Sequence, residues 1–111
     1  MYLYIELWKS RPKWSELSQD ERKSWMDDLV AGFPELFESG VEPIGLAFND
    51  ADTSHSSGYD YLAVWKMPNK EVALQFENHV ENLGFHDFFE QVNTRGKVAE
   101  MEEIVAAMAN G

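Results

Sequence analysis

One carboxylate near the start of the chain, Glu6, has the surroundings that general acid or base chemistry needs. It lies in a strictly alternating run over residues 2–8, which predicts a β-strand. One face of that strand carries Glu6 with Tyr2, Tyr4 and Trp8, and the other face is aliphatic. A carboxylate enclosed by rings loses hydration, which raises its pKa and suits a general base. The same glutamate also fits a purely structural role, hydrogen-bonded to a tyrosine or tryptophan across a subunit seam.

Histidines add candidate proton carriers, because the ordinary pKa of histidine is about 6.5. His86 and His55 can each shuttle a proton, hold a metal together with Glu6, or be plain surface residues. The spacing Asp50-x-Asp52-x-x-His55 has metal-ligating residue types, but it lacks the further oxygens of a calcium loop and a second histidine nearby. It indicates a solvated turn, so no metal is expected.

The composition excludes several classes of function. With 9 basic and 20 acidic residues the formal charge is −11, which repels nucleic-acid backbones and acidic membranes. There is no cysteine, and therefore no disulfide, zinc-thiolate site or thiol nucleophile. No apolar run approaches the roughly 20 residues of a membrane span, and the N-terminus does not resemble a signal peptide. We therefore expect a soluble, cytoplasmic protein. No nucleotide-binding or hydrolase motif is present, and no cofactor is expected.

The elements that must position these residues follow from apolar periodicity and turn signals. The capping-box spacing of Ser18 and Glu21 predicts a helix start, Pro34 predicts a kink or early break in its last turn, and Gly40 ends it. Residues 9–13 are predicted to be a loop. Strands are predicted over 41–48, 59–66 and 89–94, with a helix over 68–84 and a helical turn over 85–90. A short amphipathic helix over 101–108 is expected to cover a sheet edge or dock on a partner.

This order of elements predicts an α+β fold. The sequence β-α-β-β-α-β is the ferredoxin-like arrangement, an antiparallel sheet of order 4-1-3-2 with both helices on one face. All 111 residues are expected to form this one domain, with the short C-terminal helix as an addition. We expect the aliphatic face of the first strand to pack on the helices. The opposite face, with Tyr4, Trp65 and other rings, is too apolar to stay wet, so a second copy is expected to cover it and close a dimeric α+β barrel.

The same topology predicts where side chains meet. The end of the first strand lies beside the start of the third and the end of the second, so one end of the barrel gathers five candidates. These are Glu6, Trp8, Asn49, Tyr59 and Tyr61. The loop with His55 is expected to lie above them, and the segment entering the last strand brings His86 to the same end. Lys9, Arg11 and Lys13 are expected to lie at the mouth, either to steer an anionic ligand or to offset nearby carboxylates.

Parts of the chain resemble a known superfamily. The run Leu62-Ala63-Val64-Trp65-Lys66, a Pro/Asn helix start, Phe76, His79, and His86 ahead of Phe88-Phe89 are similar to the second half of dimeric α+β barrel proteins. That superfamily includes antibiotic-biosynthesis monooxygenases, haem-degrading monooxygenases and polyketide cyclases. The segments 49–52, 59–61 and 89–93 resemble small uncharacterised bacterial members more closely. The resemblance places His86 where a haem-ligating or catalytic histidine can sit. Glu6 departs from the neutral amide or histidine of such enzymes, which argues against haem.

These observations predict a homodimer whose cavity binds a small aromatic or polyketide-like compound. The expected chemistry is cofactor-independent proton abstraction, isomerisation or cyclisation, with monooxygenation implied only by the resemblance. Glu6 is the expected base and His86 its partner. Tyr61 is the third expected catalytic residue, as a donor that orients the ligand or stabilises an oxyanion. The remaining site residues are expected to bind the ligand or form the walls: Tyr4, Trp8, Asn49, His55, Tyr59 and Trp65. Two alternatives stay open. The cavity can serve a non-catalytic binding or sensing protein, or the partner's side chains can fill it and leave only an interaction protein.

Overall fold

The computed structural model describes all 111 residues. It contains four strands and six helices in the order β-α-α-α-β-β-α-α-β-α. The strands are β1 (Tyr2–Ser10), β2 (Glu42–Phe48), β3 (Tyr61–Met67) and β4 (Phe89–Lys97). The helices are α1 (Pro12–Ser15), α2 (Gln19–Ala31), α3 (Phe33–Glu38), α4 (Lys70–Asn82), α5 (Phe85–Phe88) and α6 (Met101–Ala109).

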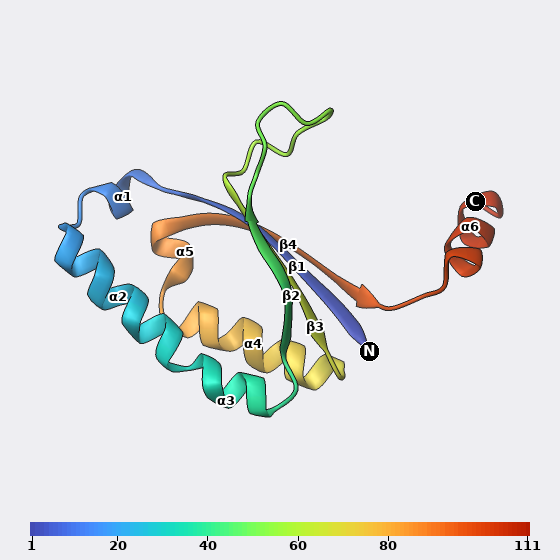
Figure 1. Cartoon of the computed structure of the whole chain (residues 1–111), viewed down its shortest axis with the longest axis horizontal. Coiled ribbons are helices and arrows are strands. Elements are labelled where there is room, and N and C mark those ends of the chain that lie inside the picture. The colour runs from blue at the N-terminus through green and yellow to red at the C-terminus, as the bar shows by residue number, and fades with distance from the viewer.

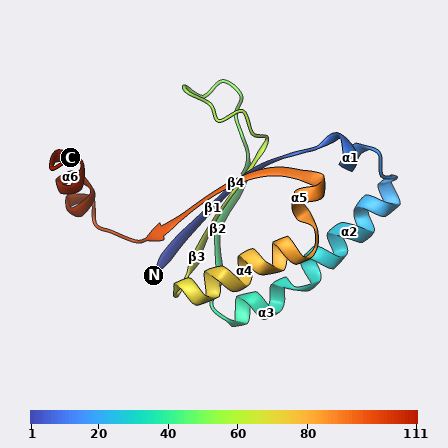
Figure 2. The same ribbon diagram turned by 180° about the vertical axis from the view of Figure 1, so that it is seen from behind.

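The four strands form one antiparallel sheet of order β2-β3-β1-β4. This is the predicted order, and the ferredoxin-like α+β fold class is confirmed. Helices α2, α3 and α4 lie together on one side of the sheet (Figure 1), and the view from behind shows the same layering (Figure 2). The central position of β1, between β3 and β4, puts Glu6 in the middle of the sheet rather than at its edge.

The first helical segment begins and breaks where the sequence predicts. Ser18 Oγ accepts from the Glu21 backbone N–H at 3.1 Å, and a Glu21 carboxylate oxygen accepts from the Ser18 N–H at 2.9 Å, which completes the capping box. The break falls at Gly32, with Pro34 in the first turn of α3. A Cβ at Gly32 would collide with the imidazole of His79, so a glycine is needed where this corner approaches α4.

The structure reverses the predicted assignment of the two faces of the sheet. The face of Tyr4, Glu6 and Trp8 packs on the helices, and the aliphatic face is the uncovered one. Tyr4 and Trp65 contact Phe76 of α4 with ring centroids 5.5 and 4.9 Å apart. The helices themselves present rings towards the sheet, and large rings fill the wide gap between a helix layer and a sheet by edge-on contacts. The prediction that a second copy covers the aromatic face is therefore wrong.

The uncovered face consists of aliphatic rows that run across the sheet. In one row Leu7 of β1 pairs with Leu62 of β3 and Val92 of β4, and Leu62 pairs with Ala47 of β2. In the next row Ile5 pairs with Val64 and Thr94. We call this surface the aliphatic face, formed by Leu3, Ile5, Leu7, Ala47, Leu62, Val64 and Val92. No helix in this chain packs over the aliphatic face, and Leu3 and Val92 are therefore 37% and 45% exposed.

Several boundaries differ from the prediction. Strand β1 runs on to Ser10 and a single turn, α1, follows, where a loop over 9–13 was expected. Strand β3 begins at Tyr61 rather than Tyr59, and β4 extends to Lys97. These ends are set by pairing, since β1 gives β4 a partner for all nine of its residues.

The C-terminal helix α6 lies apart from the other helices, beyond the end of β4 (Figure 1). All its residues are exposed, including Met101 at 78% and Met108 at 76%. No helix in the structure is long and apolar enough to cross a membrane.

Candidate functional site

Glu6 is the one charged residue that the fold buries, with only 6% of its surface exposed. Its direct cross-strand partners are Ala63 on β3 and Asn93 on β4. Ala63 is small, so the indole of Trp65, two residues along β3, can reach the carboxylate diagonally. Gln91 approaches from β4 in the same diagonal way. The sheet therefore offers Glu6 one hydrogen-bond donor from each neighbouring strand.

Four side chains form a continuous hydrogen-bonded line through this point, which we call the Glu6 network. Trp65 Nε1 donates to Glu6 Oε1 at 2.6 Å, and Gln91 Nε2 donates to Glu6 Oε2 at 2.5 Å. The other end of the amide, Gln91 Oε1, lies 2.7 Å from His86 Nε2. His86 is exposed and belongs to α5. The network thus connects a buried carboxylate to an imidazole in contact with solvent.

Burial raises the pKa of Glu6 above its ordinary value of 4.5, because the charged carboxylate loses hydration. The hydrogen bonds from Trp65 and Gln91 oppose this shift, since both stabilise the charged form, and the nearby His86 opposes it further. Desolvation outweighs these effects. Glu6 therefore holds a proton at a higher pH than a free glutamate does, which moves it towards the range in which general bases work.

Tyr4 lies beside Glu6 on the same face of β1. Burial and then the Glu6 carboxylate raise the pKa of the Tyr4 phenol well above its ordinary value of 10.0, so the hydroxyl stays protonated. It is a hydrogen-bond donor rather than a base.

A cavity of about 130 Å³ lies between the sheet and helices α2, α3 and α4, and Glu6 is its one polar lining residue. Trp8 and Trp65 line it from the sheet, and Phe76 and Val80 line it from α4. Leu46, which is 60% exposed, lines it from the edge strand β2. We call this the Glu6 cavity. A carboxylate in a ring-lined hollow of this size suits a compact apolar ligand with one polar group.

A second hollow, of about 290 Å³, lies on the other side of Val80 and is polar. Tyr4, Glu77, His86 and Gln91 line it. Val80 lines both hollows. The Glu6 network therefore runs from the apolar cavity into a more polar one, which offers a route between the buried carboxylate and water.

The structure brings only some of the predicted site residues together. Glu6, Trp8 and Trp65 line one cavity, and His86 joins Glu6 through an intervening residue rather than by direct contact. Tyr61 stacks on Trp8 with ring centroids 5.6 Å apart, so it supports the cavity wall from behind.

Three other predicted residues lie in or beside the loop between β2 and β3, which projects away from the helices (Figure 1). Asn49 Nδ2 donates to the Tyr59 carbonyl at 2.7 Å, which closes the loop base instead of orienting a ligand. His55 is exposed and adopts a left-handed backbone with φ of 55°. Asn49, His55 and Tyr59 line neither hollow beside Glu6.

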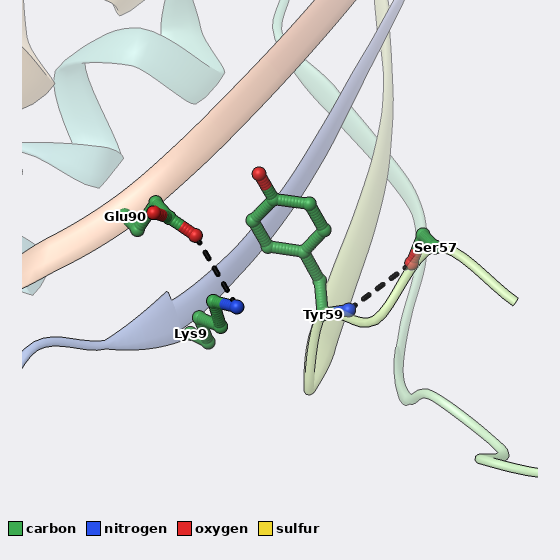
Figure 3. A network of polar contacts seen from close by, with 4 residues as sticks. All are labelled: Lys9, Ser57, Tyr59 and Glu90. Atoms are coloured by element: carbon green, nitrogen blue, oxygen red, sulfur yellow. Dashed lines mark hydrogen bonds and ion pairs between the residues drawn. The ribbon is translucent and has the colours of Figure 1, made fainter.

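The basic cluster expected at the mouth is occupied by local contacts. Lys9 lies between the Glu90 carboxylate, at 3.3 Å, and the ring of Tyr59, whose centroid is 5.3 Å away (Figure 3). Arg11 Nε donates to the His86 carbonyl at 3.1 Å, and Lys13 lies 5.5 Å from the Phe88 ring. These contacts favour the local charge-offsetting role over ligand steering.

Gln91 is the site residue that the sequence analysis missed. The alternation of Phe89, Gln91, Asn93 and Arg95 on one face of β4 carries the signal, because it directs polar side chains towards the helix layer. Arg95 on this face pairs with Glu77 of α4 at 2.7 Å. The pattern is hard to recognise beforehand because it is polar where a strand facing a core is expected to be apolar.

Comparisons with known proteins identify a family and a fold. The model of a protein family described as a family of unknown function, DUF6616, matches residues 1–111. No curated protein matches the sequence.

Solved structures resemble the chain at low sequence identity. A mutant of the chlorite dismutase from Candidatus Nitrospira defluvii gives a TM-score of 0.73 at 14% identity, over 97% of this chain and 44% of that one. The Arabidopsis thaliana protein At3g17210 gives 0.60 at 13%, over 91% and 98%. A dimeric ferredoxin-like protein of unknown function from Bacteroides fragilis gives 0.51 at 11%, over 87% and 95%. This chain spans less than half the length of the chlorite dismutases. At these identities the likeness extends to the fold alone.

Proposed function

This chain belongs to DUF6616, a family of unknown function, and from its own side chains we propose that it binds a compact ring compound in the Glu6 cavity and moves a proton on it. The observation that carries this proposal is the solitary carboxylate in an apolar, ring-lined hollow. A charged group is rarely buried unless it has a functional or structural role. Glu6 is the proposed base, and His86 its proton-exchange partner.

The size and lining of the cavity define the ligand class. About 130 Å³ is close to the roughly 150 Å³ of an apolar protein cavity that holds benzene. Trp8, Trp65 and Phe76 provide faces and edges for ring stacking. A phenol-like or enolisable ring compound fits this description, and a polyketide-like chain would have to extend past Leu46 at the exposed edge. The proposed reactions are proton abstraction, isomerisation or cyclisation, and monooxygenation is supported only by the superfamily resemblance.

A non-catalytic binding or sensing role is the second candidate, and one observation favours it. Both oxygens of Glu6 already accept hydrogen bonds, from Trp65 and Gln91. A carboxylate held this way is a weaker base than an unpartnered one and can serve to anchor the ligand.

Binding is testable through the indoles that line the cavity. Titration with phenol is expected to change the tryptophan fluorescence in a saturable way, because a ring seated in the cavity contacts Trp8 and Trp65. A Trp8→Phe variant should lose much of the response. A Trp14→Phe variant should keep it, since Trp14 contacts Trp25 and Phe88 and does not line the cavity. An equal loss in both variants, or no saturable response in wild type, counts against the cavity as a ligand site.

The aliphatic face and α6 support a homodimer, which we propose as the second part of the function. The fold neighbour from Bacteroides fragilis is itself described as dimeric. Helix α6 and the aliphatic face border a hollow of about 350 Å³, lined by Leu3, Ile5 and Thr94 on the sheet side and by Ile104 on the helix side. The aliphatic face and α6 thus present exposed apolar side chains to the same gap. The sheet of a partner subunit would fill this gap and bury both surfaces.

The contribution of α6 to this dimer is separable from the fold. A chain that ends at Ala99 is expected to keep its folded structure, because α6 buries none of its own residues. Its dimer should dissociate more easily, by about tenfold in the dissociation constant for every 1.4 kcal/mol of lost contact. Sedimentation equilibrium of the two chains measures the difference. Identical dissociation constants would show that α6 does not touch the partner.

A further inference from the structure

The Glu6 network has a fixed hydrogen-bond direction at its buried end. The indole Nε1–H of Trp65 can only donate, so Glu6 Oε1 must always accept. A proton on Oε2, the oxygen that faces Gln91, can find an acceptor, because the amide of Gln91 can turn its carbonyl towards it and the indole of Trp65 cannot accept. Oε2 is therefore the favoured position for a proton that Glu6 takes up. The uptake of a proton by Glu6 therefore changes the hydrogen bond between Oε2 and the amide of Gln91.

When Glu6 is charged, every contact of the network is satisfied in one arrangement. Oε2 accepts from Gln91 Nε2, which leaves Gln91 Oε1 facing His86 Nε2 at 2.7 Å. A carbonyl oxygen cannot donate, so His86 must carry a proton on Nε2. The imidazolium and the neutral Nε2–H tautomer both meet this condition.

When Glu6 is neutral, this arrangement places two donors against each other, the Oε2–H of Glu6 and the Nε2–H of Gln91. Rotation of the Gln91 amide by half a turn removes the conflict, because the carbonyl then accepts from Glu6. The amide N–H₂ of Gln91 now faces His86 Nε2, which has to present a lone pair. Only the neutral Nδ1–H tautomer of His86 does so.

The geometry points to Gln91 as a positioning residue that couples the protonation of buried Glu6 to the tautomer of exposed His86. Each state of Glu6 selects one orientation of the amide. With charged Glu6 that orientation requires a proton on His86 Nε2, and with neutral Glu6 it requires a lone pair there. An unsatisfied donor at the buried contact between Glu6 and Gln91 is costly, which favours one orientation of the amide in each state of Glu6.

Other charged groups near the network leave this coupling intact. Tyr4 on β1 stays protonated, and Glu77 on α4 is held by Arg95 of β4 at 2.7 Å. Glu81 of α4 lines the polar hollow, and Asp87 follows His86 on α5. None of these groups makes a hydrogen bond to Gln91, whose side chain has Glu6 and His86 as its partners.

The coupling gives a proton leaving the substrate a way out of the site, and this role rests on the proposed function. Where His86 starts as an imidazolium, the transfer of a ligand proton to Glu6 turns the amide, and the imidazolium is no longer accommodated. His86 then releases one proton to solvent as Glu6 gains one, so the net charge of the network stays the same. The ligand keeps the electron pair of the broken bond and carries the one new negative charge, which lies beside a neutral Glu6 rather than a charged one.

Nitrogen NMR of the ligand-free protein tests the coupling without any activity. With ¹⁵N-labelled histidine, the shifts of Nδ1 and Nε2 distinguish the two tautomers and the imidazolium. We expect Glu6→Gln to fix His86 with an unprotonated Nε2, because the introduced amide donates to Gln91 just as a neutral carboxyl does. In wild type the Nε2 signal of His86 should change as the Glu6 carboxyl carbon is titrated.

Two glutamine variants complete the test. In Gln91→Leu, the tautomer of neutral His86 should no longer follow the charge of Glu6, and adding Glu6→Gln to it should leave that tautomer unchanged. The charges of Glu6 and His86 still act on each other through space in this variant, so the tautomer is the readout. Gln75→Leu, at an exposed position of α4, is the matched control and should behave as wild type. A His86 Nε2 that stays protonated in Glu6→Gln would overturn the coupling. Because no ligand is present, a failed ligand titration leaves this result standing, and a failed coupling leaves ligand binding standing.

Discussion

The Glu6→Gln protein is expected to lose about 10²- to 10⁴-fold in turnover of a bound ring compound while it keeps its fold. It should also lose a pH dependence of stability that wild type has. Burial raises the pKa of Glu6, so between its ordinary value of 4.5 and its native value the folded state binds a proton that the unfolded state has released. The free energy of unfolding contributed by Glu6 therefore falls as the pH rises through that window, and stays lower above it. The amide carries no such proton.

Urea unfolding of both proteins from about pH 4 to about pH 8 measures this difference. The variant should gain stability relative to wild type as the pH rises. Glu71→Gln is the matched control, because it removes the same charge from an exposed position of α4 that lines neither hollow beside Glu6. A constant difference between Glu6→Gln and wild type across the whole range would show that Glu6 has the same pKa in the folded and the unfolded chain, and the raised pKa that supports Glu6 as the base would be lost.

Ligand affinity and turnover of the Glu6→Gln protein separate a catalytic Glu6 from one that only binds the ligand. A base that only anchors a ligand predicts weaker binding in Glu6→Gln, because the charged hydrogen bond to the ligand is lost. A base that abstracts a proton predicts similar binding and lost turnover, since the amide still accepts from Trp65 but cannot take up a proton. Affinity and rate, measured on the same variant with the same ring compound, distinguish the two.

The sequence contains the order of elements but leaves the choice of sheet face open. Local signals fixed the capping box at Ser18, the break before Pro34 and the strand that carries Glu6. The face was ambiguous because both sides of β1 are apolar, so alternation alone cannot say which side meets the helices. The rings of Phe33 and Phe76 determine which face meets the helices, because they pack on Trp65. These contacts join residues that are far apart in the sequence, so no local pattern shows them.

The candidate site was also predictable only in its local part. Glu6 among aromatic rings is a local pattern, and it holds in the folded chain. The loop residues Asn49, His55 and Tyr59 were placed by topology alone. In the structure Asn49 closes the base of the loop on the Tyr59 carbonyl, and the loop projects away from the helices (Figure 1). The alternation of β4 puts Gln91 on the helix-facing side of the sheet, but its contact with Glu6 depends on the register of β4 against β1, a long-range property that no local window contains.

An Ile5→Asp substitution is expected to separate the proposed dimer into monomers. Ile5 lies near the centre of the aliphatic face, between Val64 and Thr94 of the two neighbouring strands. A two-fold interface repeats each change, so two uncompensated carboxylates would be buried at its centre. A loss of at least about 2 kcal/mol for each one raises the dissociation constant by roughly three orders of magnitude. Light scattering at micromolar concentration should change from twice 12.8 kDa to 12.8 kDa.

Val30→Asp is the matched control for this change. Val30 is a β-branched residue on α2 that is 55% exposed, and it lies in the helix layer on the opposite side of the sheet. The same charge there should leave the mass at twice the chain value, which shows that added negative charge alone does not dissociate the protein. Ile5 also points away from the Glu6 cavity, so the monomer should still bind ring compounds if the cavity belongs to one chain. A wild-type mass of 12.8 kDa, or an Ile5→Asp protein that stays dimeric, would remove the aliphatic face as the interface and leave the exposed rows of the sheet without a partner.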